Sequence, residues 1–281
     1  MEYELILLLI SWGALVGLVF SLVGAAGGIL SSFGLITLIG VADPNSVKPM
    51  AQLLTLATAA VFIPSYVRRK ASVIPLAAIL SIGGIMGAIL GSTLSNIYLA
   101  DMSTFKPLFG MLTLAIAGQI IWESYKYRLT ESVPNQSCEL GVQQVSIKAS
   151  GIKFTYAEKK YQVSLWVPWL AGFLIAIIAS AFGVGGGFLL VPFMASFLNM
   201  PMFIIPATAA LVVFVSGAIS VTNYLRLGAE IDWHILTYLI IGGIAGAIAG
   251  PKLNLLMRDR WLKAFLAAVL GLIGLKYTFG F

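Results

Sequence analysis

Ten apolar runs, separated by glycine, proline and charged residues, make up most of this chain and constrain its fold more than any other feature. Several of them approach the roughly 20 residues that an α-helix needs to cross the hydrocarbon core of a membrane. Hydrophobic residues account for 59% of the 281 residues and charged residues for only 10%. A soluble domain is about half apolar and a quarter charged, so the sequence predicts an all-α polytopic membrane protein.

The runs form two sets of five on either side of a polar stretch. The first set is Leu5–Val23, Ile29–Ile39, Met50–Val67, Val73–Leu99 and Phe105–Trp122. The second set is Leu165–Phe182, Phe188–Leu198, Phe203–Val221, Ile235–Ala249 and Trp261–Leu275. Because the run lengths mirror each other, we expect two transmembrane repeats, residues 1–125 and 165–281, joined by a polar linker of residues 126–164.

Two short matches support an internal duplication. GGIMGAILG at Gly83–Gly91 and GGIAGAIAG at Gly242–Gly250 are identical at seven of nine positions. The same offset relates GAAGG at Gly24–Gly28 to GVGGG at Gly183–Gly187. Glycines four apart in the longer match share one helix face and let a neighbouring backbone approach closely, so we interpret that match as a helix-packing surface.

The basic residues favour inverted repeats. Arg68, Arg69 and Lys70 lie between the third and fourth runs of the first repeat, whereas the basic cluster of the second repeat, residues 252–263, lies between its fourth and fifth runs. Since Lys and Arg favour cytoplasmic loops, opposite bias in equivalent loops indicates opposite orientation. This predicts a multi-pass protein of the cell (plasma or inner) membrane, with the linker in the cytoplasm and both termini outside. A parallel arrangement is the alternative.

The linker contains alternating apolar residues around a Ser150-Gly151 turn signal. This pattern fits a small β-hairpin, and a disordered linker is the alternative. The single cysteine, Cys138, excludes an internal disulfide and a cysteine metal site. The net charge of +6 comes from loops that set topology, so nucleic acid is not expected as a partner. Expected partners are a small anionic substrate and the lipid bilayer, a homo-oligomer is left open, and no cofactor or metal is expected.

The second run of each repeat is too short to cross a membrane. Its 11 residues would span roughly 16 Å, about half of a hydrocarbon core of about 30 Å. A half-helix that follows a glycine turn at this depth is tolerated where it is buried in protein or lines a wet cavity. Its first N–H groups are open donors with partial positive charge, which suits an anion, and two such ends would converge on one midplane site.

The candidate substrate-binding residues combine the glycine turns with polar side chains nearby. Gln52, Thr55 and Thr58 share one helix face, and Thr208 is their counterpart in the second repeat. The full set is Gly24, Gly27, Gly28, Ser31, Ser32, Gln52, Thr55, Gly183, Gly185, Gly186, Gly187 and Thr208. The alternative is that the glycines only pack against neighbouring helices and that the hydroxyls only bond carbonyls of their own helix.

GVGGGFLLVPFM at Gly183–Met194, followed by NMPMFIIPATAALVVF from Asn199, resembles the TauE/SafE sulfite exporter family, also called the TSUP family of anion transporters. GAAGGILSSFGL at Gly24–Leu35 is a weaker first copy, and the resemblance covers nearly the whole chain apart from the linker. It implies transport of small sulfur-containing anions, such as sulfite, thiosulfate, sulfonates or sulfoacetate-like compounds.

The first copy departs from the family pattern where we place the ligand, which leaves the choice of anion open. The departures are Ala25 and Ala26 in the glycine run, Ser31 and Ser32 before Phe33, the lack of a proline to match Pro192, and Gln52 where a small residue is usual.

Two other functions fit parts of the sequence. Ser216 with His234 resembles an intramembrane serine protease pair, but the expected glycine before the serine is missing, and His234 suits a membrane interface. A passive anion channel also fits, because no acidic or basic residue falls firmly inside an expected span to relay protons. Asp43 and Lys48 are the nearest candidates, and a solvated loop explains both. The paired half-helices favour a transporter, not an enzyme, that works by alternating access.

Overall fold

The computed structural model describes residues 2–23, 27–68, 72–127, 143–148, 151–156, 159–198, 200, 204–253 and 259–280. The first half contains α1 (Glu2–Val23), α2 (Gly27–Phe33), the π-helical turn η1 (Gly34–Ile39), α3 (Pro44–Arg68), α4 (Ile74–Tyr98) and α5 (Met102–Tyr127). The second half contains α6 (Trp166–Phe182), α7 (Gly187–Pro192), the π-helical turn η2 (Phe193–Phe197), α8 (Ile205–Arg226), α9 (Trp233–Leu253) and α10 (Asp259–Phe279). Between them lie β1 (Gln143–Lys148), β2 (Gly151–Tyr156) and β3 (Lys159–Val163).

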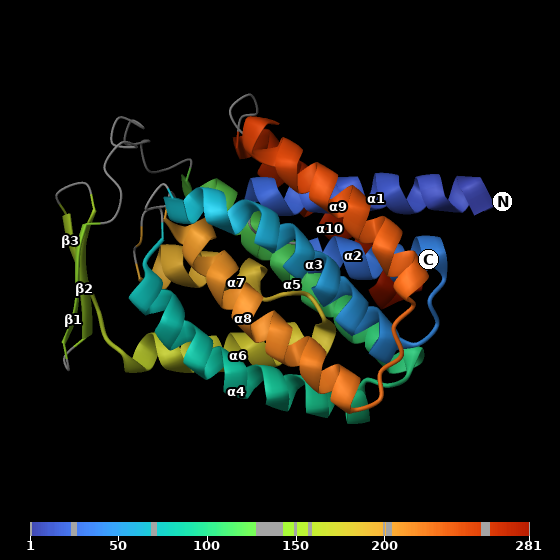
Figure 1. The fold of residues 1–281 in the computed structure, drawn as a ribbon, viewed down its shortest axis with the longest axis horizontal. Helices are drawn as coiled ribbons and strands as arrows, with labels where there is room; N and C mark the ends of the chain where they lie inside the picture. Colours follow the sequence, from blue (N-terminus) through green and yellow to red (C-terminus); the bar gives the residue numbers. More distant parts are fainter. Residues whose placement is uncertain are drawn as a thin grey trace.

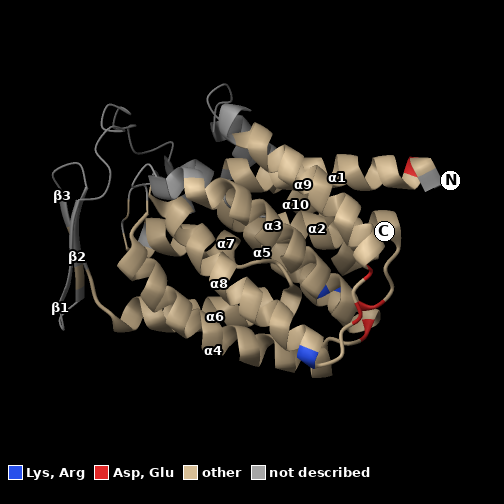
Figure 2. Cartoon of the chain, viewed as in Figure 1, with Lys and Arg blue, Asp and Glu red and all other residues tan. Residues whose placement is uncertain are grey.

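In the described chain, 6 helices are long and apolar enough to cross a membrane, namely α1, α3, α4, α5, α8 and α9. The α2–η1 unit, α6 and α10 are shorter apolar helices. Among the residues that Figure 2 colours by charge, the charged ones gather at the end of the bundle that carries the termini. The predicted all-α polytopic membrane fold is confirmed.

Two helices begin earlier than the apolar runs predict, because acidic side chains cap them. Asp43 accepts hydrogen bonds from the N–H of Asn45 and the hydroxyl of Ser46, so α3 starts six residues before the predicted Met50. Asp232 likewise accepts from the N–H groups at the start of α9. Such caps satisfy donors that the first turn of a helix leaves open. The polar residues after Asp43 are therefore helical and not a loop.

The glycine-rich helices pack across the two halves of the chain. On α4, Gly83 and Gly87 lie directly against the backbone carbonyls of Trp169 and Phe173 on α6. On α9, Gly242 and Gly246 contact the carbonyls of residues 10 and 14 on α1 in the same way. The interpretation of these glycines as packing surfaces is confirmed, and each half packs its fourth helix, α4 or α9, on the first helix of the other half.

Equivalent helices of the two halves run in opposite directions. Gly110 of α5 packs on Thr278 near the end of α10, whereas Gly274, one turn earlier in α10, packs on Leu114, one turn later in α5. In Figure 1, α1 runs away from the end that carries the N label, and α6 runs back towards that end from the β-sheet. The first helices of the two halves, α1 and α6, and the fifth, α5 and α10, therefore run in opposite directions.

The polar stretch contains a three-stranded antiparallel sheet in the order β1-β2-β3. The register pairs Lys148 with Gly151 across β1 and β2, and Phe154 with Tyr161 across β2 and β3. The third strand is not anticipated by the hairpin pattern. Ile152 and Val163 are buried in one cluster with Val73 at the start of α4, and the sheet lies at the end of the molecule opposite the termini (Figure 1).

Candidate functional site

The structure brings the two glycine breaks into direct contact. A Cβ atom added to Gly28 would lie 2.5 Å from the carbonyl carbon and oxygen of Val184. Real Cβ atoms do not approach backbone this closely, so only glycine fits at position 28. Gly27, at the start of α2, instead lies against the ring of Phe20 on α1. Gly24 lies outside the described residues.

The second break is a turn of residues 183–186 that requires glycine for its backbone geometry. Gly183, Gly185 and Gly186 have φ values of 71°, 77° and 65°. This left-handed region is open to glycine at little cost and strained for other residues. The N–H groups of Gly183 and Val184 close the end of α6 by bonding the carbonyls of residues 180 and 179. The GVGGG sequence thus forms a tight turn that leads into α7 at Gly187.

This turn leaves backbone donors unpaired inside the protein. The N–H of Gly187 bonds the carbonyl of Gly185, and those of Leu189 and Leu190 bond the carbonyl of Gly186. In the described part of the chain, no acceptor pairs with the N–H of Gly185 or of Gly186. Both residues are buried. Buried backbone donors are nearly always paired in folded proteins, so these two are available to a ligand.

On α2, two serines lie on the helix face that meets this turn. Ser31 and Ser32 follow Gly28 by three and four residues, which places them on the same face. Their side chains are 1% and 0% exposed, and the hydroxyl oxygen of each has no hydrogen-bond partner. The opposite face of α2 packs on α1, where Trp12 donates from Nε1 to the carbonyl of Leu30 at 3.2 Å.

On α3, Gln52 lies on the face that follows the turn. The backbone of Lys48 abuts Gly183, and the methyl carbon of Thr55 lies 3.3 Å from the Cβ position of Gly185. Gln52 stands between them on that face, four residues after Lys48 and three before Thr55. It is 2% exposed, and its Oε1 atom has no hydrogen-bond partner.

The hydroxyls of two predicted site residues, Thr55 and Thr208, form hydrogen bonds with backbone groups of the protein. Thr55 donates to the carbonyl of Ala51 at 2.9 Å, although its methyl group still faces the turn. Thr208 donates to the carbonyl of Ile204 and accepts from the N–H of Val73 at 3.1 Å. Thr208 therefore ties α8 to the start of α4. For these two hydroxyls the simpler alternative, bonding to backbone carbonyls, is what the structure shows.

For Lys48 the sequence left open a charged residue at a span or a residue of a solvated loop, and the structure excludes the loop. Instead of lying in a solvated loop, it is 0% exposed in the second turn of α3. Its Nζ atom donates to the carbonyl of Leu99 at 2.8 Å and to Oδ1 of Asn45 at 3.1 Å, and lies 3.5 Å from the carbonyl of Ser95. The i, i+4, i+7 spacing of Lys48, Gln52 and Thr55 places all three on one helix face if the helix begins before Lys48. The apolar run begins only at Met50, and the helix start at the Asp43 cap cannot be read from that run.

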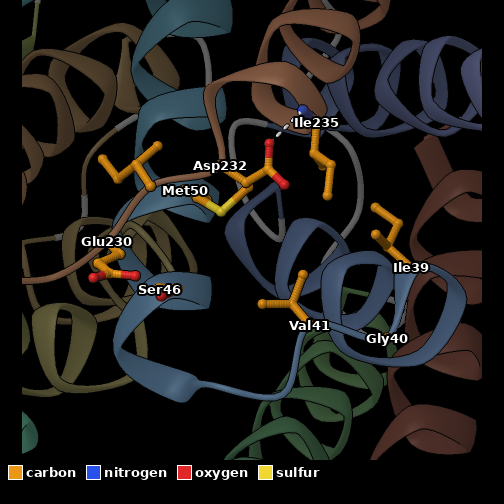
Figure 3. Close-up of a pocket in the computed structure, with 9 residues that line it drawn as sticks. Ile39, Gly40, Val41, Ser46, Met50, Glu230, Asp232 and Ile235 are labelled. Atoms are coloured by element: carbon orange, nitrogen blue, oxygen red, sulfur yellow. Dashed lines mark hydrogen bonds between the residues drawn. The ribbon is translucent and has the colours of Figure 1, made fainter.

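A separate open cavity of about 480 Å³ lies at the end of η1. Its lining residues are Ile39, Gly40, Val41, Ser46, Met50, Glu230, Ile231, Asp232 and Ile235. Figure 3 shows the carboxylates of Glu230 and Asp232 at this cavity, with Ser46 and Met50 on the α3 side. Those two α3 residues lie about half a turn away from the Gln52 face. No predicted site residue lines this cavity, and its acidic groups disfavour an anion.

Ser216 and His234, which resembled a protease pair in the sequence, each interact with other residues and not with one another. Ser216 donates to the carbonyl of Val212 at 2.8 Å, in its own helix. His234 lies exposed at the start of α9, with its ring 5.2 Å from that of Tyr238. The two side chains therefore do not form a nucleophile and its base.

Apolar helices that enclose two broken half-helices, with unpaired polar groups where the breaks meet, are typical of membrane transporters. A family model described as sulfite exporter TauE/SafE matches residues 9–277. The chain belongs to this family of membrane proteins, and the resemblance seen in the sequence is confirmed.

Two relatives cover nearly the whole chain. A probable membrane transporter protein of Xylella fastidiosa (strain 9a5c) is 27% identical over 97% of this chain and 93% of its own length. The probable membrane transporter protein YunE of Bacillus subtilis (strain 168) is 23% identical over 97% of both chains. No solved structure matches. The protein is a multi-pass membrane transporter, and its family and relatives point away from an enzyme.

Proposed function

We propose that this protein carries small sulfur-containing anions, such as sulfite, thiosulfate, sulfonates or sulfoacetate-like compounds, across the cell membrane. The binding site lies near the membrane midplane, where the turn of residues 183–186 meets Gly28. The observation that carries this proposal is the set of buried, unpaired polar groups around that contact. These are the N–H groups of Gly185 and Gly186, the hydroxyls of Ser31 and Ser32, and the carboxamide of Gln52.

The chemistry of these groups suits an oxyanion. Backbone N–H groups in a tight turn and serine hydroxyls donate hydrogen bonds to oxygen without carrying charge. The Gln52 side chain presents NH₂ or oxygen according to how the amide is turned, and the two are not distinguished by shape. Leaving a buried polar group unpaired costs about 1–3 kcal/mol. A bound anion would pair several of these groups at once, and this would offset that cost.

The arrangement of the helices supports alternating access. Each half packs its fourth helix, α4 or α9, on the first helix of the other half, and α5 and α10 run in opposite directions, as in transporters built from inverted repeats. In such proteins one bundle rocks against the other around a central site. The contact between Gly28 and Val184 lies between the two half-helices, where such a motion would expose the site to each side in turn.

The proposed orientation has both termini outside and residues 126–164 in the cytoplasm. Both chain ends lie at the end of the bundle opposite the β-sheet (Figure 1), so they share one side of the membrane. The basic residues of the linker support the cytoplasmic side for the sheet.

Calorimetry on the purified protein tests the proposed site with sulfite, thiosulfate, sulfate, taurine, sulfoacetate, acetate and chloride. Wild type is compared with Gln52→Leu, which removes the unpaired carboxamide at similar volume. The control is Thr113→Val, because Thr113 is buried in α5 and bonds only Gly110 of its own helix. We expect wild type and the control to bind a sulfur oxyanion or sulfonate, and Gln52→Leu to bind it at least about tenfold more weakly, the loss of one hydrogen bond to a charged group.

Flux measurements with the bound anion in liposomes test the transport step. Saturable uptake that is accelerated by the same anion on the opposite side supports a carrier. Single-channel currents would instead indicate a passive channel. If none of the seven anions binds, the substrate class is wrong, and if Gln52→Leu binds normally, the site lies elsewhere.

A further inference from the structure

We infer that Lys48 supplies the positive charge that restricts this transporter to anions and sets its preference between singly and doubly charged ones. The inference rests on the proposed function, because it concerns the site next to Lys48. It adds a charged specificity residue to a site whose other groups are neutral.

The charge of Lys48 is buried without an ion-pair partner among the described residues. The residue is 0% exposed, and among the residues that the structure describes no carboxylate oxygen lies within 4.0 Å of its Nζ atom. Asp43, the nearest acid in sequence, is exposed and caps α3 through Asn45 and Ser46. An ionised side chain inside a membrane protein is costly unless it is paired or serves a function.

The position of Lys48 links this charge to the candidate site. Its backbone abuts Gly183, the first residue of the turn with the unpaired N–H groups. Gln52, with its unpaired Oε1, lies one helical turn further along the same face of α3, about 6 Å along the axis. An anion held between Gln52 and the turn would therefore lie within the field of the ammonium group.

The hydrogen-bonding neighbours of Lys48 hold its ammonium group in place and carry no charge themselves. Its contacts to Leu99, Asn45 and Ser95 are all with neutral oxygens, two of them carbonyls at the C-terminal end of α4. With its donors occupied, the ammonium acts on a bound anion through its electric field, without direct contact. This field is strong in a buried site because little water screens it.

The second half has no equivalent charge. KPMAQLL at Lys48–Leu54 and IPATAAL at Ile205–Leu211 align through Pro49 and Pro206, so the counterpart of Lys48 is Ile205, which is also 0% exposed. The duplication thus conserves a buried position and gives it a cation in the first half alone. A packing role would be met by an apolar residue there, as Ile205 shows.

Calorimetry with a series of ligand charges tests the role of Lys48. The probes are thiosulfate, which is doubly charged, methanesulfonate, which is singly charged, and dimethyl sulfone, which is neutral. Wild type is compared with Lys48→Gln and Lys48→Met, two neutral variants, and with Lys48→Arg, which keeps the charge. Lys106→Gln is the control, because Lys106 is a partly exposed residue of α5. Folding of each variant is checked by gel filtration and thermal unfolding.

We expect the neutral variants to bind methanesulfonate about tenfold and thiosulfate about a hundredfold more weakly, since the interaction scales with ligand charge. Lys48→Arg and the control should stay within about threefold of wild type. Equal losses for both anions, or unchanged binding by either folded neutral variant, would overturn the inference and leave the proposed site standing. Stronger binding of dimethyl sulfone than of the anions by wild type would also overturn it. If wild type binds neither anion, the proposed function fails first and the inference fails with it.

Discussion

At the residue scale, the site is marked by side chains that the fold leaves unpaired. Several buried hydroxyls in the described part of the chain bond a nearby carbonyl, as Thr58 and Ser92 do, whereas those of Ser220 on α8 and Thr278 on α10 have no partner. Ser31 and Ser32 are equally buried but have no partner. Residues that weaken the fold in this way are expected where function requires them. Stability and binding should therefore respond in opposite directions when these hydroxyls are removed.

Ser31→Ala and Ser32→Ala should each keep or raise the melting temperature of the protein and weaken anion binding about tenfold. The alanine removes an unpaired buried hydroxyl, which costs about 1–3 kcal/mol, and with it a donor to the ligand. Thermal unfolding and calorimetry with the anion that wild type binds give the two values.

Ser92→Ala is the matched control for these serine variants. Its hydroxyl donates to Ala88 and accepts from Asn223 at 2.7 Å. We expect this change to lower the melting temperature and leave binding intact. A lower melting temperature for Ser31→Ala and Ser32→Ala, with normal binding, would show that both serines are structural.

At the element scale, close glycine contacts join helices from the two halves into pairs. The α4–α6 pair and the α1–α9 pair both place a glycine every fourth residue against backbone carbonyls of the partner helix. Such contacts let two backbones approach closely along their whole length. Each pair should therefore move as one rigid body when the site changes its access.

A disulfide within the α4–α6 pair should form and leave transport intact. The Cβ position of Gly84 lies 3.9 Å from the Cβ of Ala176, close to the roughly 3.8 Å of natural disulfides. Gly84→Cys with Ala176→Cys, in a Cys138→Ser background, should cross-link on oxidation, as seen by mobility on a denaturing gel. Uptake by the cross-linked protein should be within about twofold of the reduced protein. A complete, reversible block on oxidation would mean that the two helices separate during transport.

At the scale of the whole molecule, both termini lie at the same end of the bundle (Figure 1). The β-sheet of the polar stretch lies at the opposite end (Figure 1). In the proposed orientation, which rests on the positive-inside rule, the termini lie outside and the sheet lies in the cytoplasm. If both termini lie on one side of the membrane, the chain must cross the membrane an even number of times.

Labelling of cysteines in intact cells should confirm this orientation. Native Cys138, which precedes β1 in the sequence, should react with a membrane-impermeant maleimide only after the cells are opened. In a Cys138→Ser background, Glu2→Cys and Gly280→Cys should both react in intact cells. Labelling of Cys138 from outside would reverse the orientation, and labelling of only one terminus would contradict inverted repeats.

The sequence alone determined the class of protein, the ten helical segments, their duplication and the two glycine breaks. These features are local, because run length, glycine spacing and turn residues can be read without knowing what packs against them. It also pointed to Ser31, Ser32 and Gln52. The lengths of α3 and α9 could not be read from hydrophobicity, because acidic caps and not apolar residues start these helices.

Only the tertiary structure decided which partners each residue meets. It paired helices across the two halves, set Gly28 against Val184 and engaged the hydroxyl of Thr208 with Val73. It also buried Lys48 against the end of α4. A sequence shows which face of a helix a residue occupies, but burial, pairing and charge compensation depend on what the rest of the chain brings to that face.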